Sequence, residues 1–428
     1  MKKVLIITYY WPPSGGAGVQ RWVKFVKYMS QMGLAPIVLT VDPKYASYPQ
    51  KDETLCKDVP GNVKVYLTKS FELYSVYKKV SSNKEIPYGG FANTKTLDFK
   101  EKIIRFIRGN FFLPDPRKGW NKFAYQEATR IIKNHNIDSV ITTSPPHSTQ
   151  LIGLKLKKRL KINWIADLRD PWTDIYYYKQ LYPTWLATAI QKQYELRVIK
   201  KCDKLLTVSD ALKKLFIEKD STISNKVHVL PNGYDPDDFD IKIFPEKNDI
   251  ITISYIGTMS EDYTINGFID GINMLDSSIK NKLRIRFVGK MSDKINESFI
   301  LAGLASQVET IGYVNHKRAI EFMYTSDILL LVIPNIVNNL GILTGKLYEY
   351  LAVNRPILLI GPEQGDAAKI IQETNSGVTC DYYDSSKIRN SIQILSQRSK
   401  DIIDEPLPSS ASLKYSRITL TKELIKLL

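Results

Sequence analysis

Cysteine and histidine are scarce in this sequence. The 428 residues include four histidines and three cysteines, Cys56, Cys202 and Cys380, which lie far apart and are odd in number. None of the cysteines has another Cys or a His at the spacing of a zinc site. These absences exclude a disulfide framework and a structural zinc module, and they favour a cytoplasmic protein.

Long apolar runs are also missing. No stretch approaches the roughly 18 uninterrupted apolar residues of a membrane-spanning helix. Two lysines and a short apolar run open the chain, but Trp11-Pro12-Pro13 interrupts the run and no small-residue cleavage site follows. We therefore interpret residues 4–8 as a buried strand, and we expect neither a signal peptide nor a membrane span.

Acidic residues are scarce in the first half only. Residues 1–230 contain 39 Lys and Arg against 19 Asp and Glu, a net charge of +20, whereas the remainder contains 21 against 25, a net charge of −4. A basic face of this size would attract nucleic acid, anionic lipid headgroups or a pyrophosphate-bearing acceptor. A merely solvated basic surface is the simpler alternative.

Apolar segments alternate with helical patterns along the chain, which predicts an α/β fold with doubly wound parallel sheets. The first repeat is a strand at 4–8, a helix at 19–32 and a strand at 35–41. Further strands are expected at 63–67, 139–142, 163–166 and 205–208, and in the second half at 251–256, 284–288, 328–333 and 356–360.

A turn-rich, acidic segment at residues 231–239 is the expected junction between two domains. We predict a first Rossmann-like domain over residues 1–230 and a second over 231–412. The alternation lapses over residues 69–121, which we interpret as an insertion in the first domain. Leucines and isoleucines return at helical spacing within residues 413–428.

Glycines follow the first strand in Ser14-Gly15-Gly16-Ala17-Gly18, and a helix containing Arg21 comes next. Glycine lets the backbone approach a ligand closely, and a helix N-terminus attracts an anion. The loop lacks the Lys-Ser/Thr of a Walker A site, and Arg21 stands where a dinucleotide fingerprint has its third glycine. A phosphate site at Gly15 and Gly16 and a purely structural turn are therefore equal alternatives.

A second candidate phosphate site lies in Leu343-Thr344-Gly345-Lys346, at the start of a predicted helix, with Glu349 one turn later. Backbone amides and the Lys346 ammonium would hold a diphosphate, while the Glu349 carboxylate would accept hydrogen bonds from ribose hydroxyls. A capped surface helix that carries a Lys and a Glu is the alternative.

Four segments together resemble the family 4 glycosyltransferases, of the kind that builds bacterial cell-surface polysaccharides. They are the glycine loop leading to Arg21, Pro231-Asn232-Gly233-Tyr234-Asp235, Ser254-Tyr255-Ile256-Gly257-Thr258 and Gly345-Lys346-Leu347-Tyr348-Glu349-Tyr350-Leu351-Ala352. The last segment is the most specific, and the resemblance spans nearly the whole chain.

The resemblance implies a GT-B fold, in which two Rossmann-like domains face a cleft. It also implies a nucleotide-sugar donor seated mainly on the second domain, and sugar transfer with retention of anomeric configuration. A final helix would pack back on the first domain, a role that suits residues 413–428.

Two departures from the family pattern leave the donor open. Members often carry two glutamates eight positions apart; Glu349 matches the second, but Gly341 stands at the first. Many also grip the diphosphate with an Arg and a Lys, where this chain has Gly257-Thr258-Met259-Ser260-Glu261-Asp262. We expect a UDP- or GDP-sugar donor, bound by Gly15, Gly16, Gly257, Thr258, Lys290, Leu343, Thr344, Gly345, Lys346 and Glu349.

Two strand ends of the first domain supply the remaining candidates, because doubly wound folds bind ligands at the carboxyl ends of their strands. By resemblance, His147 would lie against the donor sugar, and Asp170 with Arg169 would face the acceptor. We place Arg21 and Trp172 on the same acceptor side. The alternatives are a structural histidine and a helix N-cap at Asp170.

A retaining transfer of this type needs no protein nucleophile, because the leaving diphosphate can itself help to deprotonate the incoming hydroxyl. We expect His147, Asp170 and Lys346 to be the catalytic residues, with Lys346 stabilising the departing phosphate. No cofactor and no obligatory metal are expected. Asp235-Pro236-Asp237 has the spelling of a metal-binding Asp-x-Asp motif, but it falls in the turn-rich junction, where it would cap a turn.

Three other functions fit parts of the sequence. A nucleotide-sugar 2-epimerase shares the two-domain architecture, and a non-catalytic nucleotide-sugar-binding protein would account for the missing first glutamate. A nucleic-acid-binding protein would explain the basic half, but no DNA or RNA signature accompanies the charge. The expected partners are a nucleotide-sugar donor and a glycan or polyprenyl-linked acceptor, and no nucleic acid.

Aromatic and basic residues interleave between residues 71 and 123, and Ile and Phe recur at amphipathic spacing over 100–112. Rings in the headgroup region beside cations that meet anionic lipid would hold the first domain at the inner face of the plasma membrane. Packing of the rings onto their own domain is the alternative. The set is Phe71, Tyr74, Tyr77, Lys78, Lys79, Lys102, Arg105, Phe106, Arg108, Phe111, Phe112, Arg117, Lys118 and Trp120.

Overall fold

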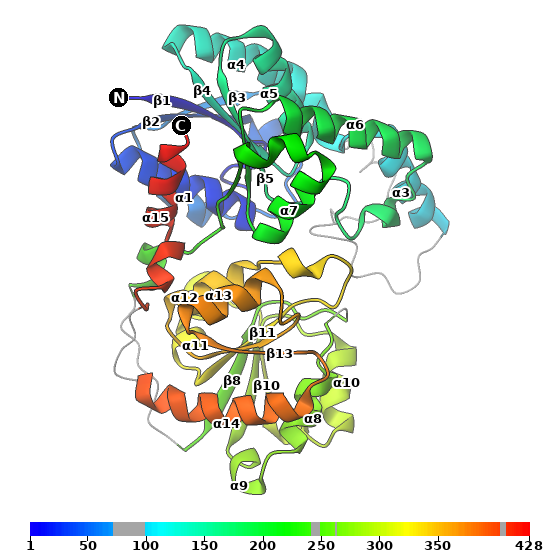
Figure 1. Cartoon of the computed structure of the whole chain (residues 1–428), viewed down its shortest axis with the longest axis vertical. Helices are drawn as coiled ribbons and strands as arrows, with labels where there is room; N and C mark the ends of the chain where they lie inside the picture. Colours follow the sequence, from blue (N-terminus) through cyan, green and yellow to red (C-terminus); the bar gives the residue numbers. More distant parts are fainter. Residues whose placement is uncertain (72–98, 241–248, 262, 403–407) are drawn as a thin grey trace. The chain divides into compact units, whose positions relative to one another are not determined.

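The computed structural model describes residues 1–71, 99–240, 249–261, 263–402 and 408–428 (Figure 1). The chain divides into a first domain of Met1–Pro231 with Leu420–Leu428, and a second domain of Asn232–Thr419. The expected boundary between residues 230 and 231 thus falls one residue later. Residues 413–428 were expected to belong wholly to the first domain, but only Leu420–Leu428 do.

Seven parallel strands form the sheet of the first domain, in the order β3-β2-β1-β4-β5-β6-β7. Alternate residues of β1 point to opposite faces: Leu5 and Ile7 join one apolar core, and Val4 and Ile6 join the other. The strands are β1 (Lys3–Ile7), β2 (Ala35–Val41), β3 (Lys64–Thr68), β4 (Ser139–Ser144), β5 (Asn163–Leu168), β6 (Lys204–Thr207) and β7 (Val227–Val229).

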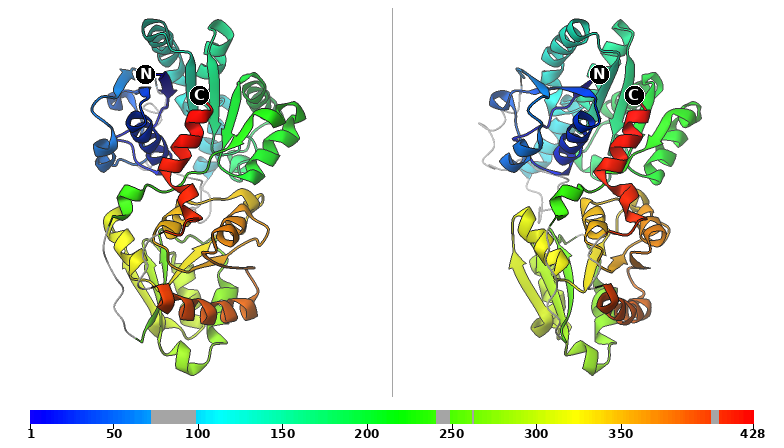
Figure 2. Two further views of the ribbon diagram at one scale, coloured as in Figure 1. Left: turned by 60° about the vertical axis from the view of Figure 1, so that its left-hand side comes forward. Right: turned by 90° about the vertical axis from the view of Figure 1, so that its left-hand side faces the viewer.

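Helices cover both faces of this sheet because each face is apolar. The core with Leu5 is closed by α4 (Asn121–His135), α5 (Ser148–Arg159), α6 (Trp185–Lys201) and α7 (Asp210–Lys219). The core with Val4 is closed by α1 (Ala17–Gln31) and by the end of α15 (Arg417–Lys426), through Leu420 and Leu424. Figure 2 shows the end of α15 beside α1.

Six parallel strands form the sheet of the second domain, in the order β10-β9-β8-β11-β12-β13. The strands are β8 (Ile251–Ile256), β9 (Leu283–Val288), β10 (Val308–Gly312), β11 (Ile328–Val332), β12 (Ile357–Ile360) and β13 (Gly377–Cys380). The predicted α/β class with two doubly wound sheets is confirmed. The strands β10 and β13 were not predicted, because these edge strands are half-exposed and lack an apolar run.

Helices again lie on both faces of the second sheet (Figure 1). One core contains residues of α8 (Asn266–Asn273), α10 (Asp293–Leu301) and α14 (Ser385–Ile402). The other contains residues of α11 (His316–Tyr324), α12 (Gly345–Ala352) and α13 (Asp366–Thr374). In the part of the chain that the structure describes, no helix has the length and apolar character needed to cross a bilayer.

Candidate functional site

Each sheet has one point from which the strand order runs outward in both directions. It lies between β1 and β4 in the first domain and between β8 and β11 in the second. Doubly wound folds bind ligands at the carboxyl ends of the strands beside such a point. The candidate residues are therefore those that follow β1 and β4 in the first domain and β8 and β11 in the second.

Lys346 reaches the carboxyl end of β8 from the first turn of α12. Its Nζ donates a hydrogen bond of 2.6 Å to the Tyr255 hydroxyl and lies 4.2 Å from the centroid of the Tyr255 ring. Burial lowers the pKa of Lys346 to about 8, and Glu349 opposes that change. The ammonium is thus partly desolvated, which strengthens its attraction for an anion.

Gly257 makes room for this lysine, and Gly289 makes room for the backbone of Gly257. Gly257, directly after β8, has φ +123°, and a Cβ there would lie 2.5 Å from Cε of Lys346. Gly289, directly after β9, has φ +126°, and a Cβ there would lie 2.4 Å from the carbonyl oxygen of Gly257. Both positions therefore require glycine, because of their backbone conformation and because of the close approach.

The N-terminus of α12 completes this edge. Thr344 precedes the helix, and its buried hydroxyl has no hydrogen-bond partner among the described residues. Gly345 is exposed, whereas Leu343 packs against the apolar core. Unused amides of a helix N-terminus attract an anion, and here Lys346 lies beside them. Of the other predicted donor residues, Thr258 and Lys290 are exposed after β8 and β9.

Glu349 is not free in this structure. Its Oε1 lies 3.1 Å from Nε2 of His316, the first residue of α11, and the pair is partly exposed. Sequence reasoning missed His316, although a histidine that begins a helix soon after the end of β10 is at the ligand edge of the sheet. The carboxylate must share or exchange this contact if it binds ribose hydroxyls.

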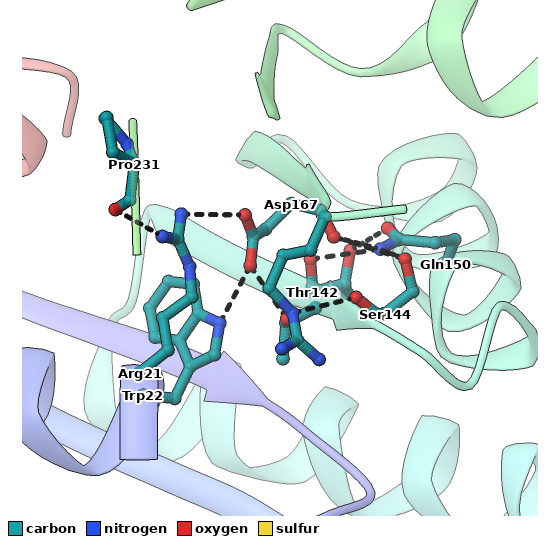
Figure 3. Close-up of polar contacts among 9 residues, drawn as sticks. Arg21, Trp22, Thr142, Ser144, Gln150, Asp167 and Pro231 are labelled. Atoms are coloured by element: carbon teal, nitrogen blue, oxygen red, sulfur yellow. Dashed lines mark hydrogen bonds and ion pairs between the residues drawn. The ribbon is translucent and has the colours of Figure 1, made fainter. Parts of the chain in front are cut away.

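Arg21 has a different place from the one predicted. It is fully buried and forms an ion pair of 3.2 Å with Asp167, whose other oxygen accepts hydrogen bonds from Trp22 and Thr143 (Figure 3). Its Nη1 also donates to the carbonyl of Pro231, at 2.7 Å. Arg21 therefore ties α1 to β5 and to the end of the domain, and it does not face an acceptor.

A second buried group lies next to this ion pair. The Gln150 amide donates to the carbonyls of Thr142 and Asp167 and to the Ser144 hydroxyl, and its oxygen accepts from the Thr142 hydroxyl (Figure 3). The polar residues at the ends of β4 and β5 are thus largely used to join the two strands. Asp167, which the sequence reasoning did not select, is the centre of this framework.

The glycine loop is also held by the protein itself. The Gly15 amide donates to the carbonyl of Gln50 at 3.0 Å, while Gly16 precedes α1 with φ +103°. A Cβ at Gly18 would lie 2.4 Å from Nη1 of Arg169, so this glycine admits the guanidinium. These contacts favour the structural turn at Gly15, and they leave Gly16 as the predicted donor residue of the loop.

His147 stacks on Trp172, with the ring centroids 4.7 Å apart and the planes 12° from parallel. Trp172 is buried and donates to Gln191, so it supports His147 and does not face an acceptor as predicted. Burial, with Arg169 and Lys219 nearby, lowers the pKa of His147 to about 3. The imidazole is neutral at ordinary pH, and its Nδ1 has no hydrogen-bond partner among the described residues.

Asp170 follows β5 and makes no hydrogen bond or ion pair within the described ranges. Burial raises the pKa of its carboxyl, Arg169 opposes the rise and Asp167 adds to it. No helix begins at Asp170, so the N-cap alternative does not hold. The carboxylate that caps α5 is Asp115, which accepts from the Ser148 amide at 2.6 Å and was not predicted.

Comparison with known proteins gives a consistent result. Residues 90–238 match the model of Glycosyltransferase Family 4. An uncharacterized glycosyltransferase of Methanocaldococcus jannaschii is 24% identical over 241 residues, which are 54% of this chain and 59% of that relative. The family match covers 149 of the 428 residues, and that part of the chain is similar to glycosyltransferase family 4. The predicted resemblance to the family 4 glycosyltransferases is therefore supported over this part of the chain.

Solved glycosyltransferases share the fold over the whole chain. A glycosyltransferase from Rickettsia africae superposes with a TM-score of 0.62 at 14% identity, covering 100% of this chain and 97% of that one. Anabaena HepE in complex with UDP-glucose gives a TM-score of 0.59 at 12% identity, covering 100% and 99%. The family 4 match lies mainly in the first domain, whereas Lys346 and Glu349 lie outside it.

Proposed function

We propose that this protein is a retaining glycosyltransferase that moves a sugar from a nucleotide-sugar donor to a glycan or polyprenyl-linked acceptor in surface polysaccharide assembly. The observation that carries the donor assignment is the ammonium of Lys346, held beside the helix amides of α12 at the strand ends of the second domain. A diphosphate matches that combination of a cation and unused amides. We rank UDP-sugars above GDP-sugars as candidate donors, because Anabaena HepE was solved with UDP-glucose.

In this proposal, the residues divide between the leaving group and the acceptor. Lys346 and the α12 amides stabilise the charge that develops on the departing diphosphate, and Glu349 receives the ribose hydroxyls. His147 is neutral at ordinary pH and so positions a sugar hydroxyl by hydrogen bonding. Asp170, with a raised pKa and no internal partner, is assigned to the acceptor hydroxyl.

Transfer is proposed to need no obligatory metal, because Lys346 and the helix amides supply positive charge at the diphosphate. The Asp235-Pro236-Asp237 sequence does not contradict this proposal, since the Asp235 side chain accepts a hydrogen bond from the Asp237 amide and caps a 3-10 turn. Transfer rates that are unchanged in EDTA would support the proposal. A rate that is lost in EDTA and restored by Mg²⁺ or Mn²⁺ would overturn it.

The function is tested by a thermal-shift screen of UDP- and GDP-sugars, followed by product analysis with the donor that binds. Sugar transferred to an acceptor glycan or polyprenyl acceptor, with the anomeric configuration kept, is the expected result. An epimerised free donor would identify a 2-epimerase. Binding without turnover on any acceptor would identify a non-catalytic nucleotide-sugar-binding protein.

We also propose that the first domain lies on an anionic membrane surface through α3 (Phe99–Phe111). Arg105 and Gly109 face inward, and a Cβ at Gly109 would lie 2.3 Å from the carbonyl oxygen of Leu181. The outward residues include Phe99 and Phe111, whose side chains are 73% and 75% exposed. This helix presents its rings to the surroundings and its glycine to the protein, the reverse of an ordinary surface helix.

More apolar side chains continue this surface. Trp185, at the start of α6, is 82% exposed, and a shallow hollow of about 370 Å³ is lined by Lys102, Ile103, Phe106 and Tyr182. Contiguous exposed apolar patches often mark docking surfaces, and cations beside them attract anionic lipid. Trp120, in contrast, is buried in the core, and Tyr74, Tyr77, Lys78 and Lys79 lie outside the described residues.

Vesicle sedimentation tests the membrane proposal. We expect the protein to sediment with anionic vesicles at low salt, less so as salt is added, and not at all when Phe106, Ile107 and Phe111 are changed to serine. The matched control changes Ile300 and Leu301, exposed apolar residues of α10 in the second domain. Equal binding by the wild type and the α3 variant would exclude this surface.

A further inference from the structure

We propose that Tyr255 is a positioning residue that holds the Lys346 ammonium over Gly257, ready for the diphosphate of the donor. This inference rests on the proposed function and names a residue that the sequence reasoning treated only as part of a strand. It also explains how the chain keeps a single cation in place where many family members use an Arg and a Lys.

The Tyr255 hydroxyl donates one hydrogen bond and accepts another. Tyr255 donates its proton to the carbonyl oxygen of Thr258 at 2.9 Å, so its oxygen is free to accept the hydrogen bond of 2.6 Å from Nζ of Lys346. The ring of the same tyrosine lies under the ammonium, at 4.2 Å. Three contacts, to the oxygen, the ring face and Gly257, therefore define the position of one flexible side chain.

Both partners of the ammonium are neutral, and this decides what they can do. An ion pair with a carboxylate would satisfy the lysine and would compete with an incoming anion. A phenol oxygen accepts one of the three N–H donors of an ammonium, and the others stay available for phosphate oxygens. Burial raises the pKa of Tyr255 well above its ordinary value, so the phenol stays neutral over the working pH range.

The charged and titratable groups around Lys346 are few. Glu349 lies one turn along the same helix and is paired with His316 of α11. Tyr263 contacts Tyr255 edge-on, with ring centroids 6.2 Å apart, and the Tyr350 hydroxyl accepts from the Ile256 amide. Glu349 is the only carboxylate that acts on Lys346 among the described residues.

Because the phenol oxygen stabilises the charged form of the Lys346 amine, removal of that oxygen should lower the pKa of Lys346. The pKa of Lys346 is about 8, so the lysine loses its proton, and its grip on a diphosphate, as pH rises through that value. Tyr255→Phe keeps the ring and loses the hydroxyl, which should move this loss to lower pH. A merely structural tyrosine would leave the pH profile where it is.

The first experiment needs no ligand. Competitive acetylation of the whole protein across pH 6 to 10, with mass spectrometry of the Lys346 peptide, gives the titration midpoint of that amine. We expect a lower midpoint in Tyr255→Phe than in the wild type. The control is Tyr324→Phe, which removes another buried phenol that donates to a backbone carbonyl of the same domain. An unchanged midpoint in a folded Tyr255→Phe protein would overturn the inference.

The second experiment measures UDP, GDP and the free nucleosides by calorimetry at pH 7 and pH 9. Tyr255→Phe should bind the diphosphate about three- to tenfold more weakly at pH 7 and bind the nucleoside as the wild type does. Equal diphosphate affinity for the two proteins would overturn the positioning role and leave the proposed function intact. A wild type that binds no nucleotide or nucleotide sugar, even with a shifted Lys346 midpoint, would overturn the proposed function and with it the link to a donor.

Discussion

The ligand edges of the two sheets use similar residues in opposite ways. At the ends of β4 and β5, Asp167 and Arg21 are buried against each other. At the end of β8, Lys346 donates to a neutral phenol and forms no ion pair among the described residues, and the Thr344 hydroxyl has no partner there either. Most polar groups at the first edge bond to one another and join its strands. Those at the second edge remain available to bind a ligand.

This difference separates a framework from a binding site more clearly than residue type does. Arg21 comes soon after β1, and Lys346 reaches the end of β8. Both strands lie where the strand order of their sheet reverses, so each residue was a reasonable candidate for binding an anion. The arginine is neutralised by a carboxylate inside the protein, so a ligand would have to displace a buried ion pair. The lysine needs no such displacement.

The largest expected effect is on the framework. Asp167→Asn leaves the buried Arg21 guanidinium without its counter-charge, so the free energy of unfolding should fall by about 3 to 5 kcal/mol. Urea denaturation measures it. The matched control is Asp170→Asn, three positions along, which removes a carboxylate with no internal partner and should change stability little while it reduces transfer. Similar stabilities for the two variants would contradict the comparison.

The next effect is on the second edge. Lys346→Ala should weaken nucleoside diphosphate binding by about thirtyfold and nucleoside binding much less, because a hydrogen bond to a charged group contributes about 1.5 to 3 kcal/mol. Isothermal calorimetry with UDP and uridine separates the two losses. Lys294→Ala, which removes an exposed cation of α10 that is not assigned to the donor, is the control. If the two variants lose affinity equally, the special position of Lys346 is wrong.

The sequence predicted the layout of this protein better than its contacts. Buried strands such as β11 and β12 are continuous apolar runs, so hydrophobicity alone locates them. The edge strands β10 and β13 lack that signal, because one side of each is open and polar residues are tolerated there. The α/β class follows from the central strands and does not depend on the edges.

Contacts across many residues could not be predicted from residue type. Arg21 and Asp167 are 146 positions apart, and the sequence does not show that one neutralises the other. The pairs Lys346 with Tyr255 and Glu349 with His316 are 91 and 33 positions apart. The amphipathic spacing of residues 100–112 indicated a helix, but only the packing of Gly109 on Leu181 shows that the apolar side faces outward.

Acid should destabilise the first edge through His147. Its pKa is about 3 in the folded protein and about 6.5 when unfolded, so the unfolded chain takes up a proton first as pH falls through that window. Stability is therefore lost between pH 6.5 and 3, by about 1 to 2 kcal/mol after allowance for partial exposure of the ring.

Thermal unfolding of the wild type and His147→Asn at pH 7, 5.5 and 4 measures this contribution. The variant has no imidazole at this position, so its stability should fall less steeply with acid, although its stability at pH 7 is lower because the stacking on Trp172 is lost. Parallel curves for the two proteins would show that His147 is as accessible to protons as an unfolded histidine.

The smallest effect is expected at Glu349. Its partner among the described residues, His316, is partly exposed, so the pair contributes little to stability. Glu349→Gln should leave the unfolding transition unchanged and weaken nucleotide-sugar binding about two- to fivefold, because an amide oxygen accepts ribose hydroxyls less strongly than a carboxylate. The control is Glu321→Gln on α11, a surface carboxylate paired with Arg318.

His316→Ala extends the test of Glu349. If the histidine competes with ribose for the carboxylate, its removal should tighten donor binding. If it orients the carboxylate, donor binding should weaken. Calorimetry that finds wild-type affinity in Glu349→Gln and in His316→Ala would remove this pair from the donor site and leave Lys346 and the α12 amides as the binding groups of the second edge.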